Sequence, residues 1–293
     1  MSARHSFGAL WREATLRLEA ANLRYGQGTE DAAQEAAWML IHVLQLPLLE
    51  SFARLRALQR RVVPAAAQRE LWRLVEARIA GRRPLAYLLG EAWLHGQRFV
   101  VDERVIVPRS FIAELLDDAL MPWLGDAPRR IVDVCTGSGC LAILAAQRWP
   151  QAQVWGGDLS VDALQVAAAN VALHHSAVQL CRSDLLRELP ADIDLLLCNP
   201  PYVNAASMRA LPAEFRHEPA LALAGGADGM DLVRRLLAQA ALQLAPDGIA
   251  VVEIGHEREH FEAAFPTLPV VWMATSEPDR VFLVDAAALR AAR

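Results

Sequence analysis

The chain has 293 residues, of which 54% are hydrophobic and 22% charged, and its formal net charge is −5. This composition predicts one large or two smaller folded domains and excludes a disordered chain. All 29 basic residues are arginines, so lysine chemistry (a Schiff base or a phosphate-loop lysine) is excluded. The four cysteines show neither a C-x-x-C pair nor zinc spacing, and no apolar run approaches the roughly 18 residues of a membrane span. We therefore expect a cytoplasmic protein without a metal site or a membrane partner.

Charge divides the chain into two parts. Residues 1–104 contain 15 arginines and 11 acids, whereas residues 105–293 contain 14 arginines and 23 acids. The most basic stretch is Arg54–Arg83, where nine arginines face only Glu70 and Glu76. A solvated helix face and a nucleic-acid contact both explain this stretch, and a basic face on an acidic protein favours a polyanionic partner.

The first part of the chain has helical periodicity. Apolar residues recur at helical spacing in three runs: Leu10, Ala14, Leu18 and Ala21; Ala37, Leu40, Ile41 and Leu44; and Leu71, Leu74, Val75 and Ile79. These runs predict a helical domain over residues 1–90. Between residues 91 and 108 apolar residues alternate with polar ones around Gly96, which predicts a β-hairpin linker.

After Pro128 strand and helix patterns alternate. The strands are predicted over 131–134, 153–156, 178–181, 193–198, 249–254, 270–274 and 280–284, and the helices over 140–148, 161–173, 232–244 and 257–265. This order predicts a doubly wound, mostly parallel α/β sheet in a domain over residues 109–293.

A nucleotide-site pattern follows the first of these strands. The segment from Asp133 through Thr136, Gly137 and Gly139 holds a G-x-G-x-x-A pattern, in which glycines let the backbone approach a ligand. NAD, FAD and S-adenosylmethionine sites all share this pattern. Asp158 lies 25 residues after Asp133, where an acid accepts ribose hydroxyls, although it could also cap the following helix.

Two details favour S-adenosylmethionine among these cofactors. A carboxylate at Asp133 suits the amino group of the methionine part, whereas it would repel the pyrophosphate of a dinucleotide. Asp184 follows the third strand, where a side chain could meet the adenine amine. A plain loop cap ahead of Leu185 remains the alternative for Asp184.

The most specific signal is Asn199-Pro200-Pro201-Tyr202, at the end of a predicted central strand. Neither proline has an N–H, so this stiff loop offers carbonyl oxygens, and Asn199 adds one more. Two acceptors can hold a planar –NH2 group and aim its nitrogen at an activated methyl group. Tyr202 supplies a flat packing surface. The alternative is a Pro-Pro turn that only closes the strand.

With these motifs the chain resembles the protein N5-glutamine methyltransferases, from about Arg82 to the C-terminus. The likeness rests on Asn199–Tyr202, on the Asp133–Gly139 loop and on Pro108-Arg109. It implies a class I S-adenosylmethionine-dependent methyltransferase fold, with Rossmann-like topology and an N-terminal helical substrate-recognition domain. It also implies that Asn199 and Pro200 bind a glutamine amide, and that Asp133, Gly137, Asp158 and Asp184 bind the cofactor.

The family has two branches, which act on ribosomal protein L three or on peptide-chain release factors. Pro108–Glu114, Asp133–Cys140 and Phe215–Pro219 resemble the ribosomal branch, although Phe111 and Leu94 depart from its pattern. This likeness implies ribosomal protein L three as the substrate and favours a ribosomal RNA contact through Arg54–Arg83. Three alternatives stay open: a release-factor enzyme, an exocyclic-amine (N6-adenine type) nucleic-acid methyltransferase, and an assembly factor that binds the cofactor without transferring its methyl group.

Overall fold

The computed structural model describes residues 5–292. Its contacts divide the chain into two units. The helical unit comprises the residues up to Glu91 together with Pro212–His217. The second unit comprises Ala92–Leu211 and the residues from Glu218 onward, and it is called the catalytic unit below because it holds the predicted catalytic loop Asn199–Tyr202. The chain therefore leaves the catalytic unit after Leu211 and returns at Glu218.

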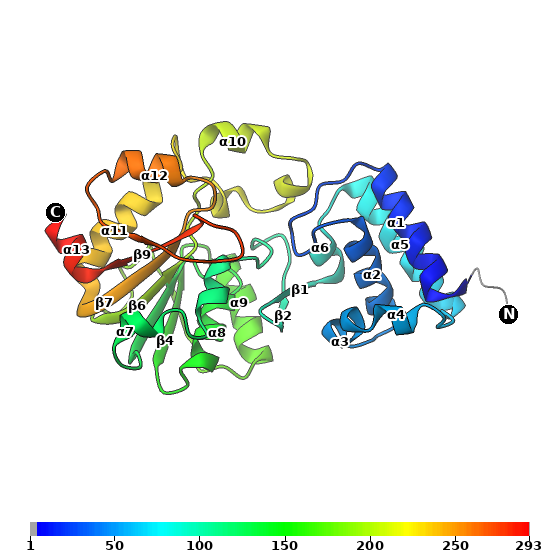
Figure 1. Cartoon of the computed structure of the whole chain (residues 1–293), viewed down its shortest axis with the longest axis horizontal. Coiled ribbons are helices and arrows are strands. Elements are labelled where there is room, and N and C mark those ends of the chain that lie inside the picture. Colours follow the sequence, from blue (N-terminus) through cyan, green and yellow to red (C-terminus); the bar gives the residue numbers. More distant parts are fainter. Residues whose placement is uncertain (1–4, 293) are drawn as a thin grey trace. The chain divides into compact units, whose positions relative to one another are not determined.

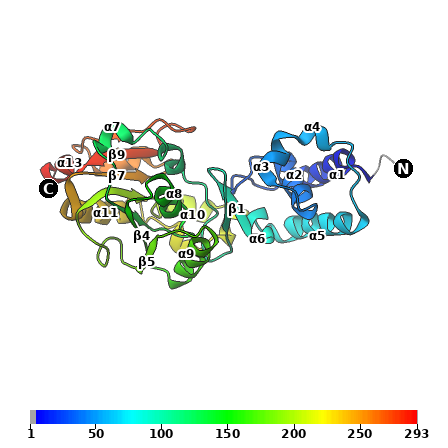
Figure 2. The same cartoon turned by 90° about the horizontal axis from the view of Figure 1, so that it is seen from below.

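The helical unit is built from short amphipathic helices. They are α1 (Phe7–Ala20), α2 (Ala32–Val43), α3 (Leu48–Ala53), α4 (Leu55–Leu58), α5 (Ala65–Gly81), α6 (Leu85–Leu89) and the 3-10 helix η3 (Glu214–His217). The side chains of Ser6 and Asp31 cap α1 and α2, because each accepts a backbone N–H of the first turn. Helix α1 packs against α2 and α5 (Figures 1 and 2).

The predicted apolar runs mostly form the core of this unit. Leu10, Ala14 and Leu18 of the first run are buried. The first three residues of each of the other two runs are buried as well: Ala37, Leu40 and Ile41, and Leu71, Leu74 and Val75. Helix α5 differs at one place, because Arg78 is 1% exposed whereas Ile79 is only partly buried. The sequence pattern placed Arg78 on a basic surface, and that assignment is wrong. A guanidinium can be buried here because Glu35, on α2, supplies its counter-charge.

The catalytic unit is an α/β sheet domain. Its strands are β1 (Glu91–Leu94, beginning at the unit boundary), β2 (Gln97–Val100), β3 (Arg130–Val134), β4 (Gln153–Asp158), β5 (Gln179–Arg182), β6 (Ile193–Cys198), β7 (Leu244–Glu253), β8 (Val271–Trp272) and β9 (Val281–Asp285). Its helices are η2 (Phe111–Leu115), α7 (Met121–Leu124), α8 (Cys140–Arg148), α9 (Val161–Leu173), α10 (Ala205–Ala210), η4 (Ala220–Ala222), α11 (Asp231–Gln243), α12 (Arg258–Ala264) and α13 (Ala286–Ala291).

Seven of these strands form one sheet in the order β5-β4-β3-β6-β7-β9-β8. Pairing is parallel from β5 to β7 and antiparallel at β9 and β8. The prediction of a doubly wound, mostly parallel sheet is confirmed. The strand order reverses between β3 and β6, and ligands bind at such a reversal, beyond the carboxyl ends of the strands.

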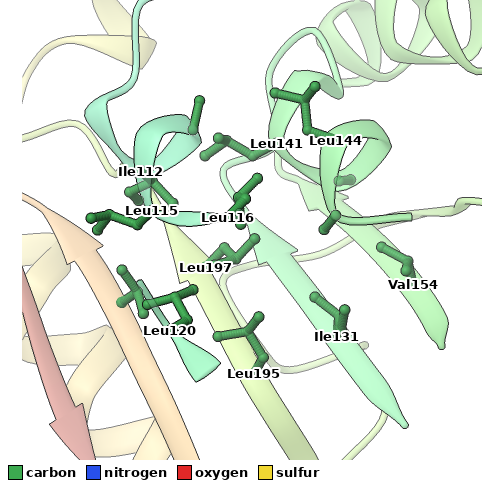
Figure 3. Close-up of a cluster of buried hydrophobic side chains, with 14 of the residues drawn as sticks. Ile112, Leu115, Leu116, Leu120, Ile131, Leu141, Leu144, Val154, Leu195 and Leu197 are labelled. Atoms are coloured by element: carbon green, nitrogen blue, oxygen red, sulfur yellow. The ribbon is translucent and has the colours of Figure 1, made fainter. Parts of the chain in front are cut away.

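Both faces of the sheet are buried, and the side chains of each central strand alternate between them. Leu195 and Leu197 of β6 join a core with η2 and α8 (Figure 3), whereas Leu196 and Cys198 face α11 and α13. Burial on both faces explains why β6 is almost continuously apolar. This packing holds the strand rigid up to the residue that precedes Asn199.

The predicted hairpin linker is shorter in the structure than in the sequence pattern. Strands β1 and β2 end at Val100, and residues 101–108 form no strand, so the hairpin covers only the first part of the predicted linker, whose boundary at 108 stays a prediction. The backbone turns at Asp102, whose carboxylate accepts the N–H of Arg104, and the N–H of Val107 donates to Glu218. These side-chain bonds replace the ladder that a strand would need.

Among residues 5–292 no helix has the length and apolar character needed to cross a membrane.

Candidate active site

The candidate site lies where four neighbouring strands end. Asp158 closes β4, Asp184 follows β5, and Asn199 follows β6, while the loop after β3 carries Gly137. Gly137 and Gly139 both have positive φ, of 55° and 79°, which a glycine adopts without strain. The N–H of Gly137 donates to the Asp158 carboxylate at 2.9 Å, so this acid holds the loop as well as facing the site.

One cavity opens at these strand ends. It brings together five of the predicted site residues: Gly137, Asp158, Asp184, Asn199 and Pro201. Its wall also includes apolar side chains and two arginines, namely Arg104, Val105, Ile106, Leu159, Ala163, Leu185, Leu221, Leu232 and Arg235. Asp133, Thr136, Gly139, Pro200 and Tyr202 are not in the wall, so the structure divides the predicted site into wall residues and supporting residues.

Asp133 lies just beneath the glycine loop and is 1% exposed. Its Oδ2 accepts the Thr136 hydroxyl at 2.5 Å and the Ala142 N–H at 3.2 Å, whereas its Oδ1 has no partner within the described chain. The pKa of Asp133 is raised to about 7, mainly by burial and to a smaller extent by the charge of Asp158, while the two hydrogen bonds act in the opposite direction. An unpartnered buried carboxylate oxygen fits a ligand that brings a cation, such as an ammonium group.

Thr136 and Gly139 support the loop. The Thr136 hydroxyl donates to Asp133, and the Thr136 carbonyl accepts the N–H of Gly139. A Cβ atom at Gly139 would lie 3.2 Å from the Cβ of Ala167 on α9. In the structure Gly139 permits a close approach between the loop and a helix, and its predicted part in the cofactor site stays a prediction.

The two acids of the wall are held differently. Asp158 accepts backbone N–H groups, at hydrogen-bond distance from Gly137 and Ser160, and burial raises its pKa. Ser160, not Asp158, caps the first turn of α9. Asp184 instead forms ion pairs with Arg235 at 2.6 Å and with Arg187 at 3.2 Å, and the hydrogen bond from Arg235 lowers its pKa. Asp158 is therefore the acid with free acceptor capacity.

The Asn199–Tyr202 loop is clamped just after its last residue. Val203 donates to the Leu223 carbonyl at 2.8 Å, and Gly225 donates back to the Val203 carbonyl at 2.9 Å. A Cβ atom at Gly225 would lie 2.7 Å from the Tyr202 backbone, so only glycine lets these segments approach so closely. The clamp holds Asn199 and Pro201 at the cavity without using their side chains.

Tyr202 packs away from the cavity wall. A Cβ atom at Gly255 would lie 2.5 Å from its ring, so the ring lies directly on that backbone. Burial raises the pKa of Tyr202, and the charge of Glu253 raises it further. The hydroxyl is therefore neutral at physiological pH, and the predicted flat surface lies against the protein itself.

Sequence reasoning gave no role to an ion pair behind the loop. Arg109 binds Glu218 through two hydrogen bonds, at 2.5 and 2.8 Å, and Glu218 also accepts the Val107 N–H at 3.0 Å. Glu218 is 3% exposed, and the next residue, Pro219, lines the cavity. Arg109 belongs to Pro108-Arg109 and Glu218 to Phe215–Pro219, two motifs on which the resemblance rests. Their presence in such motifs is the sequence feature that could have pointed to the ion pair.

Sequence reasoning left two further residues without an assigned role. Asn170, on α9, accepts the Val100 N–H and donates to the carbonyls of Val100 and Ser138, so it ties strand β2 to the glycine loop. Glu253, at the end of β7, accepts the Ser110 hydroxyl at 2.6 Å and the Phe111 N–H at 2.9 Å, and burial raises its pKa to about 7. No local pattern marks either residue, because their partners are 32 to 143 residues away in sequence.

Known proteins share both units. Residues 9–90 match the PrmC N-terminal domain, and residues 111–228 match the methyltransferase small domain. The hMettl16 catalytic domain, solved with an RNA hairpin, superposes with a TM-score of 0.50 at 13% identity, over 77% of this chain and 84% of that one. At that identity the likeness concerns the fold alone, and it agrees with the class I methyltransferase topology.

Closer relatives cover nearly the whole chain. The ribosomal protein uL3 glutamine methyltransferase of Bordetella pertussis is 54% identical over 94% of this chain and 93% of its own length. The protein of the same name from Burkholderia pseudomallei is 48% identical over 96% of this chain and 95% of its own length. With this identity, and with Asn199 and Asp158 on one cavity at the strand ends, the chain belongs to the family of ribosomal protein uL3 glutamine methyltransferases.

Proposed function

We propose that this enzyme transfers a methyl group from S-adenosylmethionine to the side-chain amide nitrogen of a glutamine in ribosomal protein uL3 (protein L three above). The observation that carries the proposal is that Asn199 and Pro201 share a cavity with Asp158 and Gly137. The residues proposed to bind the glutamine amide and those proposed to bind the ribose therefore line the same cavity. We place the reaction in the cytoplasm, where ribosomes assemble in bacteria.

The wall and its support divide the work. Asp158 accepts the ribose hydroxyls, and the free Oδ1 of Asp133 accepts the ammonium group of the methionine part. Asp184 would lie near the adenine of the cofactor, although both of its carboxylate oxygens accept hydrogen bonds from Arg235. The apolar wall, which includes Leu159 and Leu185, packs against the adenine.

Asn199, which lines the cavity, would hold one hydrogen of the glutamine –NH2 group, and the carbonyl of Pro200, which is not in the cavity wall, would have to turn toward the substrate to hold the other. Because their oxygens polarise the N–H bonds, they stabilise the positive charge that develops on nitrogen during transfer. S-adenosylmethionine supplies a sulfonium methyl group, so a C–N bond forms as the S–C bond breaks, and one amide proton is lost to water. The clamp at Val203 fixes this geometry in advance, and positioning of this kind can contribute roughly 7–11 kcal/mol.

The Asn199→Ala variant tests the proposal. We expect methylation of purified uL3 to fall about 100-fold or more, because one electrostatic contact to the transition state is lost. Cofactor affinity, measured by calorimetry, should change little. The Ser207→Ala variant, on the exposed α10, is the matched control and should keep wild-type turnover. Wild-type turnover in Asn199→Ala would contradict the role of Asn199.

Substrate choice is tested with the unmodified proteins. Methyl-labelled S-adenosylmethionine is offered with uL3 or with a release factor, and mass spectrometry locates the methyl group. Methylation of a glutamine in uL3 alone supports the proposal, whereas labelling of the release factor alone assigns the enzyme to the other branch. Labelling of nucleic acid would support the exocyclic-amine alternative.

We propose that the helical unit recognises the substrate and contacts ribosomal RNA. Six of the nine arginines of the Arg54–Arg83 stretch are exposed: Arg54, Arg56, Arg60, Arg61, Arg69 and Arg73. Arginines at such positions can contact RNA phosphates without reading sequence. The RNA surface is therefore narrower than the sequence suggests, because Arg78 is buried and Arg82 is paired with Glu214.

Charge reversal of Arg56, Arg60 and Arg61 tests this surface. We expect methylation of an RNA-bound precursor particle to fall, while methylation of free uL3 stays the same, because only the first substrate presents phosphates. Reversal of the exposed Arg12, Arg129 and Arg209 is the control for net charge. Equal effects of the two triple variants on the particle would contradict the RNA surface.

A further inference from the structure

Residues 203–223, which follow the Asn199–Tyr202 loop, form a segment that we call the excursion, and its two ends are hydrogen-bonded to each other. At its base, Val203 and Leu223 are hydrogen-bonded at 2.8 Å, immediately after Tyr202. At its tip, Pro212–His217 belongs to the helical unit, although the residues on both sides belong to the catalytic unit. One short segment of the helical unit is thus covalently joined to the loop that holds Asn199.

The tip is anchored in the helical unit by a buried carboxylate. Glu214 is 0% exposed, and its Oε1 accepts the Arg24 N–H at 3.0 Å and pairs with Arg82 at 2.7 Å. Burial alone would raise the pKa of Glu214, but the hydrogen bond from Arg24 and the charges of Arg82 and Arg78 lower it. The anchor is therefore ionic at physiological pH.

Neighbouring contacts make the anchor specific. The ring of His217 bonds the Gly81 carbonyl at 3.0 Å, and the ring of Phe215 lies against Gly26, whose φ is 105°. Arg78 donates to the Arg24 carbonyl at 3.0 Å, so the residue that binds Glu214 is itself held by the buried Arg78–Glu35 pair. A fully buried acid is costly unless it is paired, so this arrangement holds the tip at one position.

The excursion continues directly to the cofactor side of the site. Glu218, the first residue after the tip, is bound by Arg109, and Pro219, Leu221 and Ala222 line the cavity. In sequence, Glu214 is therefore four residues from Glu218, which Arg109 binds, and five from Pro219 in the cavity wall. A displacement of the tip can therefore reach the glutamine loop through Val203, or this wall through Glu218.

We infer that Glu214 is a positioning residue: by anchoring the tip in the helical unit, it orders the excursion and, through the excursion, the Asn199–Tyr202 loop. The inference rests on the proposed function, because it requires that the helical unit binds the protein substrate. Glu214 touches neither substrate nor cofactor. It acts through the excursion, so its loss should affect an intact protein substrate more than a short glutamine peptide.

The test compares the Glu214→Ala variant with the wild type on two substrates. We expect kcat/KM for intact uL3 to fall about tenfold, mainly through KM, within the range of about 5–150-fold that coupled sites show. A short peptide around the modified glutamine should lose less activity than intact uL3 does, because the peptide does not use the helical unit. Glu76→Ala, on the exposed face of α5, is the matched control.

Two further variants separate positioning from folding. Glu214→Gln keeps an acceptor for the Arg24 N–H but loses the charge, so it should recover part of the activity on uL3. Arg82→Ala removes the cation while Glu214 keeps its hydrogen bond from Arg24, and it should raise KM for uL3 less than Glu214→Ala does. Thermal unfolding of each variant shows whether the helical unit remains folded.

Amide hydrogen exchange gives a readout that needs no substrate. If the inference holds, Glu214→Ala speeds exchange at Val203 and Gly225, whose N–H groups close the base of the excursion. Unchanged exchange there, or equal losses on peptide and intact uL3, would overturn the inference. A wild-type enzyme that does not methylate uL3 would instead refute the proposed substrate, and the exchange measurement would still decide the role of Glu214.

Discussion

Two buried acids of the helical unit, Glu35 and Glu214, have arginine partners, whereas Asp133 and Glu253 of the catalytic unit form no ion pair among the described residues. Glu35 is bound by Arg78 at 2.9 Å, and Glu214 by Arg82 at 2.7 Å. Asp133 and Glu253 are buried to a similar degree, but within the part of the chain that the structure describes their hydrogen-bond donors are hydroxyl and backbone N–H groups, and their pKa values are raised to about 7. A paired acid stabilises one fold, whereas an acid without a cation can respond to a charged ligand.

The Arg78→Ala variant should show the largest effect on stability. It leaves Glu35 buried without its cation, and breaking a buried pair in this way costs about 3–5 kcal/mol. Denaturant unfolding measures this loss. The control is Arg73→Ala, whose partner Glu70 is on the surface at 2.5 Å and whose loss should cost less than about 1 kcal/mol. Equal losses in the two variants would remove the distinction between buried and surface pairs.

Cofactor binding should depend on the ionisation of Asp133. Only the ionised carboxylate attracts an ammonium group, so the affinity for S-adenosylhomocysteine should rise about tenfold per pH unit up to the pKa of about 7 and then level off. Calorimetry between pH 5.5 and 7.5 measures this dependence. Asp133→Asn should bind weakly with little pH dependence. A flat wild-type profile would show that Asp133 does not meet the amino group.

The Glu253→Gln variant should show the smallest effect, and that effect should vary with pH. Because the folded-state pKa of Glu253 is raised from 4.5 to about 7, the folded state keeps a proton that the unfolded chain releases. Glu253 therefore lowers stability progressively as pH rises from about 4.5 to 7. Glutamine removes this penalty, so the variant should equal the wild type at pH 4.5 and melt a few degrees higher at pH 8.

Thermal scans of the ligand-free protein at several pH values measure this difference, since about 1 kcal/mol shifts Tm by roughly 2–4 °C for a domain of this size. The exposed Glu262→Gln on α12 is the control, and its melting difference should not grow with pH. A Glu253→Gln variant that is less stable than the wild type at pH 8 would mean that its hydrogen bonds to Ser110 and Phe111 outweigh its charge.

Local sequence patterns were sufficient for the elements and for the wall of the site. Helices α8 and α9 and strand β6 have the predicted boundaries, because each has a clear period and a terminating residue. Asn199 and Asp158 were identifiable for a related reason: each directly follows a strand of one parallel sheet, so both must reach its carboxyl edge. Short elements such as α10 and α13 have too few residues for a period to show.

The amino-acid sequence by itself determined the doubly wound sheet, the helical first part and the acceptor-rich loop at Asn199, since all three depend on periodicity and on residues adjacent in the chain. Only the tertiary structure decided that Arg78 is buried, that Gly139 packs on α9 and that Glu214 enters the helical unit. Those outcomes depend on partners tens to hundreds of residues away. Whether a charge is buried is determined by the opposite charge that the fold brings to it.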